Sequence, residues 1–104
     1  MGSMDMKVNF YATLRLITGA KTIEFNIKEG GTVKDLVDEI VLTYPSMRQE
    51  LLDHDGNLYG HVHVFVNGRD NRFLEKRMDT QIFNRDQIDI FPAVGGGSTE
   101  NILE

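Results

Sequence analysis

The sequence of 104 residues has no cysteine, which excludes several kinds of chemistry at once. Without thiols the chain cannot form a disulfide, bind a metal through thiolates or use a cysteine nucleophile. Such a composition fits a protein of the reducing cytosol, and we expect a cytoplasmic location. A chain of this length is also typical of one domain, which leaves little room for a deep substrate cavity.

Long apolar runs and an excess of positive charge are missing as well. No stretch approaches the roughly 18 apolar residues that a membrane-spanning helix needs, and the first residues do not have the apolar run of a secretory signal. The formal net charge is −5. An acidic surface argues against nucleic acid, whose phosphates bind lysine and arginine, and it favours a basic protein partner. We therefore expect neither a membrane nor a nucleic acid as partner.

Apolar and polar residues alternate in several short segments, which is the pattern of strands with one face on a core. The segments are 7–13, 22–27, 61–66 and 87–91. A short link with Gly19-Ala20 joins the first two, so they are expected to form an antiparallel hairpin. Asn67-Gly68 is a strong turn signal after the third segment. Pro92 ends the last one, because it lacks the N–H that a ladder needs.

A helix is expected after the first hairpin. Thr32 is a good N-cap, and Asp35 follows at the position that completes a capping box. Apolar residues then recur on one helical face, and the helix ends before Pro45. These residues are Val33, Leu36, Val37, Ile40, Val41 and Tyr44. A short second helix is expected over 46–52, with Ser46 and Gln49 as its cap pair. Residues 69–82 are predicted as surface loop with at most one short edge strand.

The order strand, strand, helix, strand, strand predicts an α+β fold. Because the strands cannot bury their apolar faces alone, the helix is expected to cover one face of a shared sheet. The first and last strands would then lie side by side and parallel in the middle. We therefore predict a β-grasp domain over 6–92, with a mixed sheet of about four to five strands on one main helix. Gly2-Ser3 before a second methionine is typical of cloning residues, so residues 1–5 are predicted to be a disordered start.

The sequence contains residues that could belong to a metal site, a catalytic triad, a phosphate loop or a calcium loop. His61 and His63 would share one face of a strand, with Asp55 or Asp70 as a third metal ligand. We interpret both histidines as solvent-facing and expect no metal site. A Ser-His-Asp triad, a phosphate loop over 30–34 and a calcium loop over 53–56 all lack their defining motifs. Cap and turn roles explain those residues better.

The most unusual segment follows the last predicted strand, where Phe91-Pro92-Ala93-Val94 precede Gly95-Gly96-Gly97. Its composition fits an expression linker. The alternative is a flexible arm over 93–97 that enters a narrow channel, because glycine has no Cβ to block close backbone approach. Residues 98–104 follow as a C-terminal extension.

Three stretches of the sequence are similar to one known family. Over roughly residues 6–97 the chain resembles the small subunit of molybdopterin synthase (MoaD type), the thiamine sulfur carrier ThiS and the archaeal small modifier proteins. The stretches that carry the resemblance are Val8-Asn9-Phe10-Tyr11-Ala12-Thr13-Leu14-Arg15 with Gly19, Thr32-Val33-Lys34-Asp35-Leu36, and Val64-Phe65-Val66-Asn67-Gly68 together with 86–97.

The resemblance implies a ubiquitin-like carrier protein rather than an enzyme. An activating enzyme would use ATP and Mg²⁺ to adenylate the carboxylate of Gly97, and Gly96 would be the other half of the diglycine. No cofactor is expected to stay bound to the chain itself. The residues implied in partner binding are Arg15, Phe91, Pro92, Val94 and Gly95.

The resemblance leaves the fate of the activated glycine open. As a sulfur carrier, the chain would form a thiocarboxylate and pair with the large subunit of molybdopterin synthase in molybdenum cofactor biosynthesis. As a protein modifier, it would be joined to lysines of target proteins. A third hypothesis is a non-covalent interaction domain that docks through apolar residues on its open sheet face. Because 98–104 keep Gly97 in a peptide bond, we expect them to derive from cloning or to be removed by a maturation protease.

Overall fold

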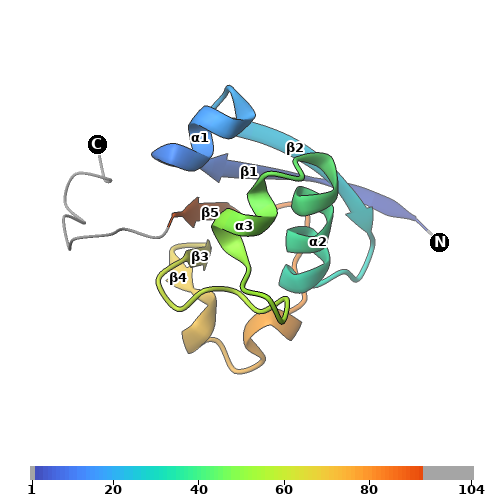
Figure 1. The fold of residues 1–104 in the computed structure, drawn as a ribbon. Coiled ribbons are helices and arrows are strands. Elements are labelled where there is room, and N and C mark those ends of the chain that lie inside the picture. Colours follow the sequence, from blue (N-terminus) through green and yellow to red (C-terminus); the bar gives the residue numbers. More distant parts are fainter. Residues whose placement is uncertain (1, 93–104) are drawn as a thin grey trace.

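The computed structural model describes residues 2–92, which form one mixed sheet with helices on one face (Figure 1). The elements are β1 (Ser3–Phe10), α1 (Thr13–Thr18), β2 (Thr22–Lys28), α2 (Val33–Thr43), α3 (Met47–Leu51), β3 (His63–Val66), β4 (Arg69–Asp70), η1 (Asn71–Phe73), η2 (Arg77–Asp79) and β5 (Ile88–Phe91). The sheet has five strands in the order β2-β1-β5-β3-β4. The predicted α+β class and β-grasp arrangement are confirmed.

The first and last strands lie side by side at the centre of the sheet, as predicted. β1 pairs with β5 in parallel, and Val8 lies opposite Ile88. β1 pairs with β2, and β3 pairs with β5, in antiparallel fashion. Because β5 is central, the chain leaves its C-terminal end between β1 and β3 rather than at an edge of the sheet.

The turn between β3 and β4 is the one that the sequence indicates. Asn67 and Gly68 both have positive φ, at 53° and 84°. This is the conformation that a two-residue type I′ hairpin requires. The side chain of Asn67 donates to Asp86 Oδ1 at 3.0 Å and accepts from Gln87 N at 2.8 Å. The turn is therefore fixed to the segment that enters β5.

α2 begins with the predicted capping box. Asp35 N donates to Thr32 Oγ1 at 3.3 Å, and Thr32 N donates to Asp35 Oδ2 at 2.9 Å. The helix ends at Thr43, with Tyr44 as its C-cap directly before Pro45. Its apolar stripe faces the sheet, so the predicted helix is confirmed.

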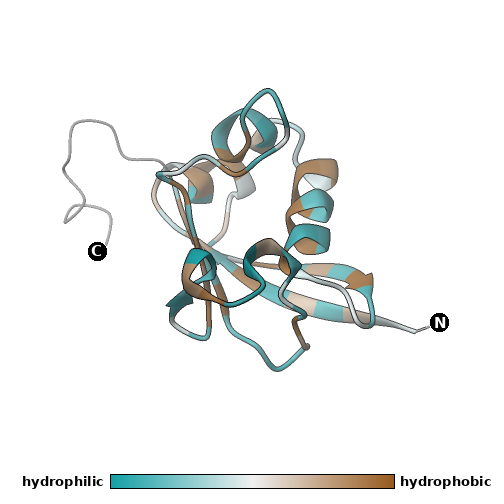
Figure 2. Ribbon diagram, turned by 90° about the horizontal axis from the view of Figure 1, so that it is seen from below, coloured by the Kyte–Doolittle hydropathy of each residue, from teal (hydrophilic) through white to brown (hydrophobic). Residues whose placement is uncertain are grey.

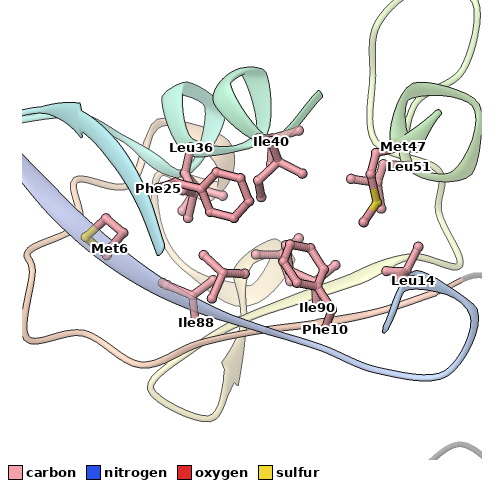
Figure 3. Packing of buried hydrophobic residues seen from close by; sticks show 14 of the residues in the cluster. Met6, Phe10, Leu14, Phe25, Leu36, Ile40, Met47, Leu51, Ile88 and Ile90 are labelled. Atoms are coloured by element: carbon pink, nitrogen blue, oxygen red, sulfur yellow. The ribbon is translucent and has the colours of Figure 1, made fainter. Parts of the chain in front are cut away.

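The hydrophobic core lies between the strands and the helices α2 and α3 (Figure 3). Hydrophobic and hydrophilic residues alternate along β1, β2 and α2 in Figure 2, because each element turns one face to this core. Burying one large apolar side chain stabilises the fold by about 1.5–3 kcal/mol. The largest buried side chains include Met6, Phe10, Leu14, Leu36, Ile40, Met47, Leu51, Ile88 and Ile90. Within residues 2–92, the helices α1, α2 and α3 leave the opposite face of the sheet uncovered, and we call it the open face.

Two predictions about the first hairpin are wrong. Residues 1–5 are predicted as a disordered start, but Ser3–Asp5 extend β1, where Ser3 pairs with Lys28 and Asp5 with Asn26. The link between β1 and β2 is also more than a turn. β1 ends at Phe10, and the positive φ of Ala12, 54°, directs the chain into α1, whose Leu14 is buried in the core.

The start of the third strand also differs from the prediction. β3 begins at His63 rather than at 61. The guanidinium of Arg72 donates to the carbonyls of Gly60 and Val62, so this stretch bonds to a side chain instead of a neighbouring strand. The short edge strand allowed within 69–82 is β4, and η1 and η2 follow it.

The cap predicted for the short second helix is wrong as well. Ser46 precedes α3 but makes no hydrogen bond to it with its side chain. Met47 N and Arg48 N donate instead to the carbonyls of Tyr44 and Pro45, at 2.8 and 3.1 Å. These bonds satisfy N–H groups that a side-chain cap would otherwise serve. Within residues 2–92, the helices are too short or too polar to cross a membrane.

Candidate docking face and tail exit

The predicted tail leaves the domain at the C-terminal end of β5. Phe91 is the last residue of this strand, and Pro92 after it is buried. Phe91 lies opposite His63 of β3, and the neighbouring Ile90 carbonyl accepts from Tyr11 N at 3.3 Å. We call Phe91 and Pro92 the tail exit. The predicted tail residues Val94, Gly95, Gly96 and Gly97 and the extension 98–104 lie outside the described residues.

Aromatic side chains gather around the tail exit on the open face of the sheet. The ring of Tyr11 stacks on Phe91, with centroids 4.3 Å apart and an interplanar angle of 12°. Phe65 meets Phe91 edge to face at 5.4 Å, and His63 meets Phe65 at 6.2 Å. We call Tyr11, Phe65 and Phe91 the aromatic patch. Its side chains come from, or directly follow, neighbouring strands, and all are half-buried.

The aromatic patch rests on a polar network centred on Asp89. Asn9 Nδ2 and Tyr11 Oη donate to Asp89 Oδ1 at 3.0 and 2.8 Å. Gln87 Nε2 donates to Asp89 Oδ2 at 3.0 Å. Burial, together with the hydrogen bond to Asp89 and the charge of that group, raises the pKa of Tyr11 to about 12. Tyr11 therefore stays a neutral donor at physiological pH, and its ring is held against Phe91.

His63 and Asp70 form a second polar cluster beside the aromatic patch. His63 Nδ1 lies 2.7 Å from Asp70 Oδ2, and Arg72 donates to Asp70 Oδ1 from its backbone N at 3.0 Å and its Nε at 3.1 Å. Burial works against ionisation of Asp70, but the hydrogen bonds from His63 and Arg72 outweigh it and lower its pKa. The cluster ties the loop before β3 to the β3–β4 hairpin.

The candidate sites that the sequence analysis set aside have structural roles. His61 is exposed and stacks on Tyr59 rather than joining His63 at a site. Within residues 2–92, no group of three or more His, Asp or Glu side chains is placed to hold a metal ion. Asp53 Oδ1 accepts from Asp55 N and Asn57 N, which is the geometry of a turn.

Of the predicted partner-binding residues, three lie within the described part of the chain. Phe91 and Pro92 form the tail exit, and Phe91 belongs to the aromatic patch. Arg15 is exposed on α1, which follows β1 at the same end of the sheet (Figure 1). No hydrogen bond or ion pair within residues 2–92 joins the Arg15 side chain to the patch.

The sequence predicts apolar docking residues on the open face, but Tyr11 and Phe65 are not among the predicted partner-binding residues. Alternation places both on the face opposite the core, and that signal was present. The predicted pairing of the first and last strands places Tyr11 near Phe91, but the position of β3 on the other side of β5, which brings Phe65 to Phe91, was not predicted. Asp89 gives no signal of its own, because a polar residue between Ile88 and Ile90 is the ordinary pattern of a half-exposed strand.

The sequence model of the ThiS family matches residues 8–97, which span β1 to the last of the consecutive glycines. The chain belongs to the ThiS family. This ThiS-family chain is 32% identical to small archaeal modifier protein 3 of Haloferax volcanii, over 90% of the chain and 100% of that protein. It is 28% identical to small archaeal modifier protein 1 of the same organism, over 88% of the chain and 100% of that protein.

Solved structures extend this relationship to ubiquitin-like β-grasp proteins with several roles. The solution structure of the Haloferax volcanii HVO 2177 protein has a TM-score of 0.79 and 32% identity, covering 92% of this chain and 89% of that one. A putative molybdopterin converting factor, subunit 1, from Pyrococcus furiosus has a TM-score of 0.68 and 27% identity, covering 88% and 99%. CysO of Amycolatopsis orientalis, crystallised with BexX, has a TM-score of 0.72 and 28% identity, covering 88% and 99%. The relatives of this ThiS-family chain therefore include small archaeal modifier proteins and a putative molybdopterin converting factor subunit, and one neighbour was solved in complex with another protein.

Proposed function

We propose that the chain is a sulfur carrier of the molybdopterin synthase small-subunit type, activated at the carboxylate of Gly97. The observation that carries the proposal is the family match, which continues past the end of β5 and stops at Gly97. The aromatic patch at the tail exit supports it, because a partner that docks there lies next to the start of the tail. The chain is then the substrate of an activating enzyme and not itself a catalyst.

The chemistry needs a carboxylate that can reach into another protein. Residues 93–97, fully extended, would span at most roughly 17 Å from the tail exit. An oxygen of the Gly97 carboxylate attacks the α-phosphorus of ATP, and pyrophosphate leaves as Mg²⁺ neutralises its charge. A hydrosulfide ion would then attack the acyl carbon, and AMP would leave with the electron pair of the broken C–O bond, which gives the thiocarboxylate. Glycine suits the second step, because it has no Cβ to hinder attack on the acyl carbon.

Residues 98–104 must be absent when this reaction occurs. While they are attached, the Gly97 carbonyl is part of a peptide bond and has no free carboxylate for ATP. A maturation protease removes them if they are native, and they are irrelevant to the reaction if they come from cloning. In both cases the active form ends at Gly97. The thiocarboxylate would then donate its sulfur within a complex with the large subunit of molybdopterin synthase.

A second candidate function is protein modification through the same activated glycine. The relatives named small archaeal modifier proteins favour it, and they align over their whole length. The two functions share adenylation by ATP and differ only in the nucleophile that displaces AMP. Sulfur gives a thiocarboxylate, whereas a lysine Nζ of a target protein gives an isopeptide bond. The aromatic patch serves docking of the activating enzyme in either case.

The test is ATP–pyrophosphate exchange with the activating enzyme encoded in the same genome as the chain. A chain ending at Gly97 is expected to support exchange, and the full chain to be inert. A Gly97→Val variant of the shortened chain should keep its fold but lose transfer, because the added Cβ crowds the channel of the partner. Exchange by the uncleaved full chain, or normal transfer by Gly97→Val, would overturn the assignment of Gly97. Mass analysis of the product then separates a thiocarboxylate from an isopeptide.

A further inference from the structure

Asp89 is a buried carboxylate at the centre of the open sheet face. Only 6% of the residue is exposed, although its side chain bonds to Asn9 and Tyr11 on the face opposite the core residues Ile88 and Ile90. In the sheet register it stands between Asn9 of β1 and Phe65 of β3. The rings of Tyr11 and Phe91 lie next along the strands toward the tail exit. Asp89 therefore lies on the same face as the aromatic patch, directly opposite Phe65 and within hydrogen-bond distance of Tyr11 Oη.

All the hydrogen bonds that reach Asp89 come from neutral groups. Its donors are Asn9 Nδ2, Tyr11 Oη and Gln87 Nε2, at 3.0, 2.8 and 3.0 Å. Thr22 Oγ1 donates to Asn9 Oδ1 at 2.6 Å, which fixes the Asn9 amide with its nitrogen toward the carboxylate. These donors hold the side chain in one place but leave its negative charge without a counterion.

Asp70, the other buried carboxylate of this face, has the charged partner that Asp89 does not have in the described part of the chain. Asp70 lies opposite Phe65 on β4, and its carboxylate has both His63 and Arg72 within ion-pair distance, at 2.7 and 3.1 Å. Within residues 2–92, no lysine, arginine or histidine forms such a pair with Asp89, and residues 93–104 contain none of these side chains. Among the described residues, Asp70 thus has the guanidinium of Arg72 as a counterion, whereas Asp89 has none.

A partner that covers the aromatic patch changes the surroundings of Asp89. It removes water from this face and lowers the local dielectric, so an uncompensated carboxylate beneath the contact opposes binding. If the partner places a cation next to the carboxylate, the contribution of Asp89 to the binding free energy becomes favourable. The net charge of −5 acts in the same direction, because it draws basic surfaces toward the domain.

The aromatic rings around Asp89 favour a planar cation. Aromatic faces attract ammonium and guanidinium groups, and arginine most often fills such positions. The chain already shows this contact at the border of the patch, where Lys21 Nζ lies 5.3 Å from the centroid of the Tyr11 ring. Phe65 and Phe91 have no such cation among residues 2–92.

We propose that Asp89 and the aromatic patch form a receptor site for an arginine side chain of the partner protein. The guanidinium lies on the rings of Phe65 and Phe91, and its charge is compensated by the Asp89 carboxylate beside them. The inference rests on the proposed function in one respect: the activating enzyme is taken as the protein that docks on this face. It adds that this enzyme presents an arginine at the centre of the contact.

The first experiment measures the KM of the activating enzyme for the chain ending at Gly97. Asp89→Asn removes the charge but keeps an oxygen that accepts from Asn9 and Tyr11. It is expected to raise KM at least about tenfold without changing kcat, the size expected when one partner of a desolvated charge pair is lost. Asp5→Asn is the matched control, because Asp5 lies on the same face of β1 and is paired with the neutral Asn26. An equal KM for both variants would overturn the proposal.

The second experiment uses the unaltered domain and does not need the enzyme. Nα-acetyl-arginine methylamide is titrated into the isotope-labelled full chain, with the citrulline analogue as a neutral probe of the same shape. The backbone signals of Asn9, Phe65 and Asp89 are expected to shift with the arginine probe alone. No shift, or equal shifts with citrulline, would overturn the proposal. A chain that shows these shifts but no pyrophosphate exchange would contradict the proposed function and leave the arginine site standing.

Discussion

Replacing Phe65 by alanine separates docking on the aromatic patch from guidance of the tail. Phe65 lies on β3 and is not part of the chain that leads to the glycines, yet its ring contacts Phe91 and His63 at centroid distances of 5.4 and 6.2 Å. Aromatic pairs contribute about 0.5–1.5 kcal/mol each beyond the area they bury. Phe65→Ala is therefore expected to lower the free energy of unfolding by about 1–3 kcal/mol.

The same substitution should weaken partner binding by more than a surface contact would. Buried aromatic residues at the centre of an interface cost about 2 kcal/mol or more when truncated, which is roughly thirtyfold in affinity. We expect the KM of the activating enzyme for the chain ending at Gly97 to rise by about this factor, with kcat little changed. A loss of uniform binding energy raises KM without lowering kcat.

Phe73→Ala is the matched control for this experiment. Phe73 is 77% exposed on η1, outside the aromatic patch, and has no aromatic partner among residues 2–92. Urea unfolding of both variants shows that the assay temperature leaves them folded. If the two variants have the same KM, the aromatic patch is not the surface on which the activating enzyme docks.

Three further outcomes follow from the polar contacts. The phenol of Tyr11, followed by its ultraviolet absorbance, should titrate with a pKa of about 12. Asp89→Asn should lower this pKa toward the usual 10.0. An unchanged pKa in the variant would contradict the hydrogen bond between Tyr11 and Asp89. Because the folded-state pKa is raised, this contribution to stability is present below pH 10 and is lost as pH rises from 10 to 12. The pKa of Asp70 is lowered from 3.8, so its contribution is present above that value and is lost as pH falls further; Asp70→Asn should flatten the acid limb of the unfolding free energy. Thr32→Ala removes one half of the capping box and should cost about 1 kcal/mol in urea unfolding, whereas an unchanged midpoint would show that the cap does not stabilise α2.

The elements with strong local patterns could be predicted from the sequence. The stripe from Val33 to Tyr44, the cap at Thr32 and the turn at Asn67-Gly68 all depend on neighbours a few residues away. The parallel pairing of the first and last strands followed from the need to cover two hairpins with one helix. These are the features in which local preference and the global fold agree.

Other elements depend on contacts that no local pattern records. α1 is stabilised by the burial of Leu14 in the core, after the positive φ of Ala12 has changed the direction of the chain. Its six residues are too few to show a helical period in the sequence. The first residues join β1 because β2 extends far enough to pair with them. Asp89 accepts hydrogen bonds from Asn9 on β1, from Tyr11 directly after β1 and from Gln87 directly before β5, and the alternation of apolar and polar residues along its own strand records none of them.

The tail exit could be predicted from the sequence, whereas the full aromatic patch could not. Phe91 and Pro92 are adjacent to the glycines in the sequence, so the tail exit could be predicted. Tyr11 and Phe65 lie far from them along the chain and meet Phe91 only in the folded sheet. The glycines that the proposal needs are recognised by sequence and family match, while the surface beside them is recognised by structure.

The central claim is that the domain holds a Gly97 carboxylate for other proteins to charge and discharge. Its most direct test is the intact mass of the protein purified from its native host. We expect a chain that ends at Gly97, with a fraction in which sulfur replaces one terminal oxygen, or a Gly97 acyl group joined to a lysine of another protein. A population that consists only of unmodified chains continuing through Glu104 would contradict it.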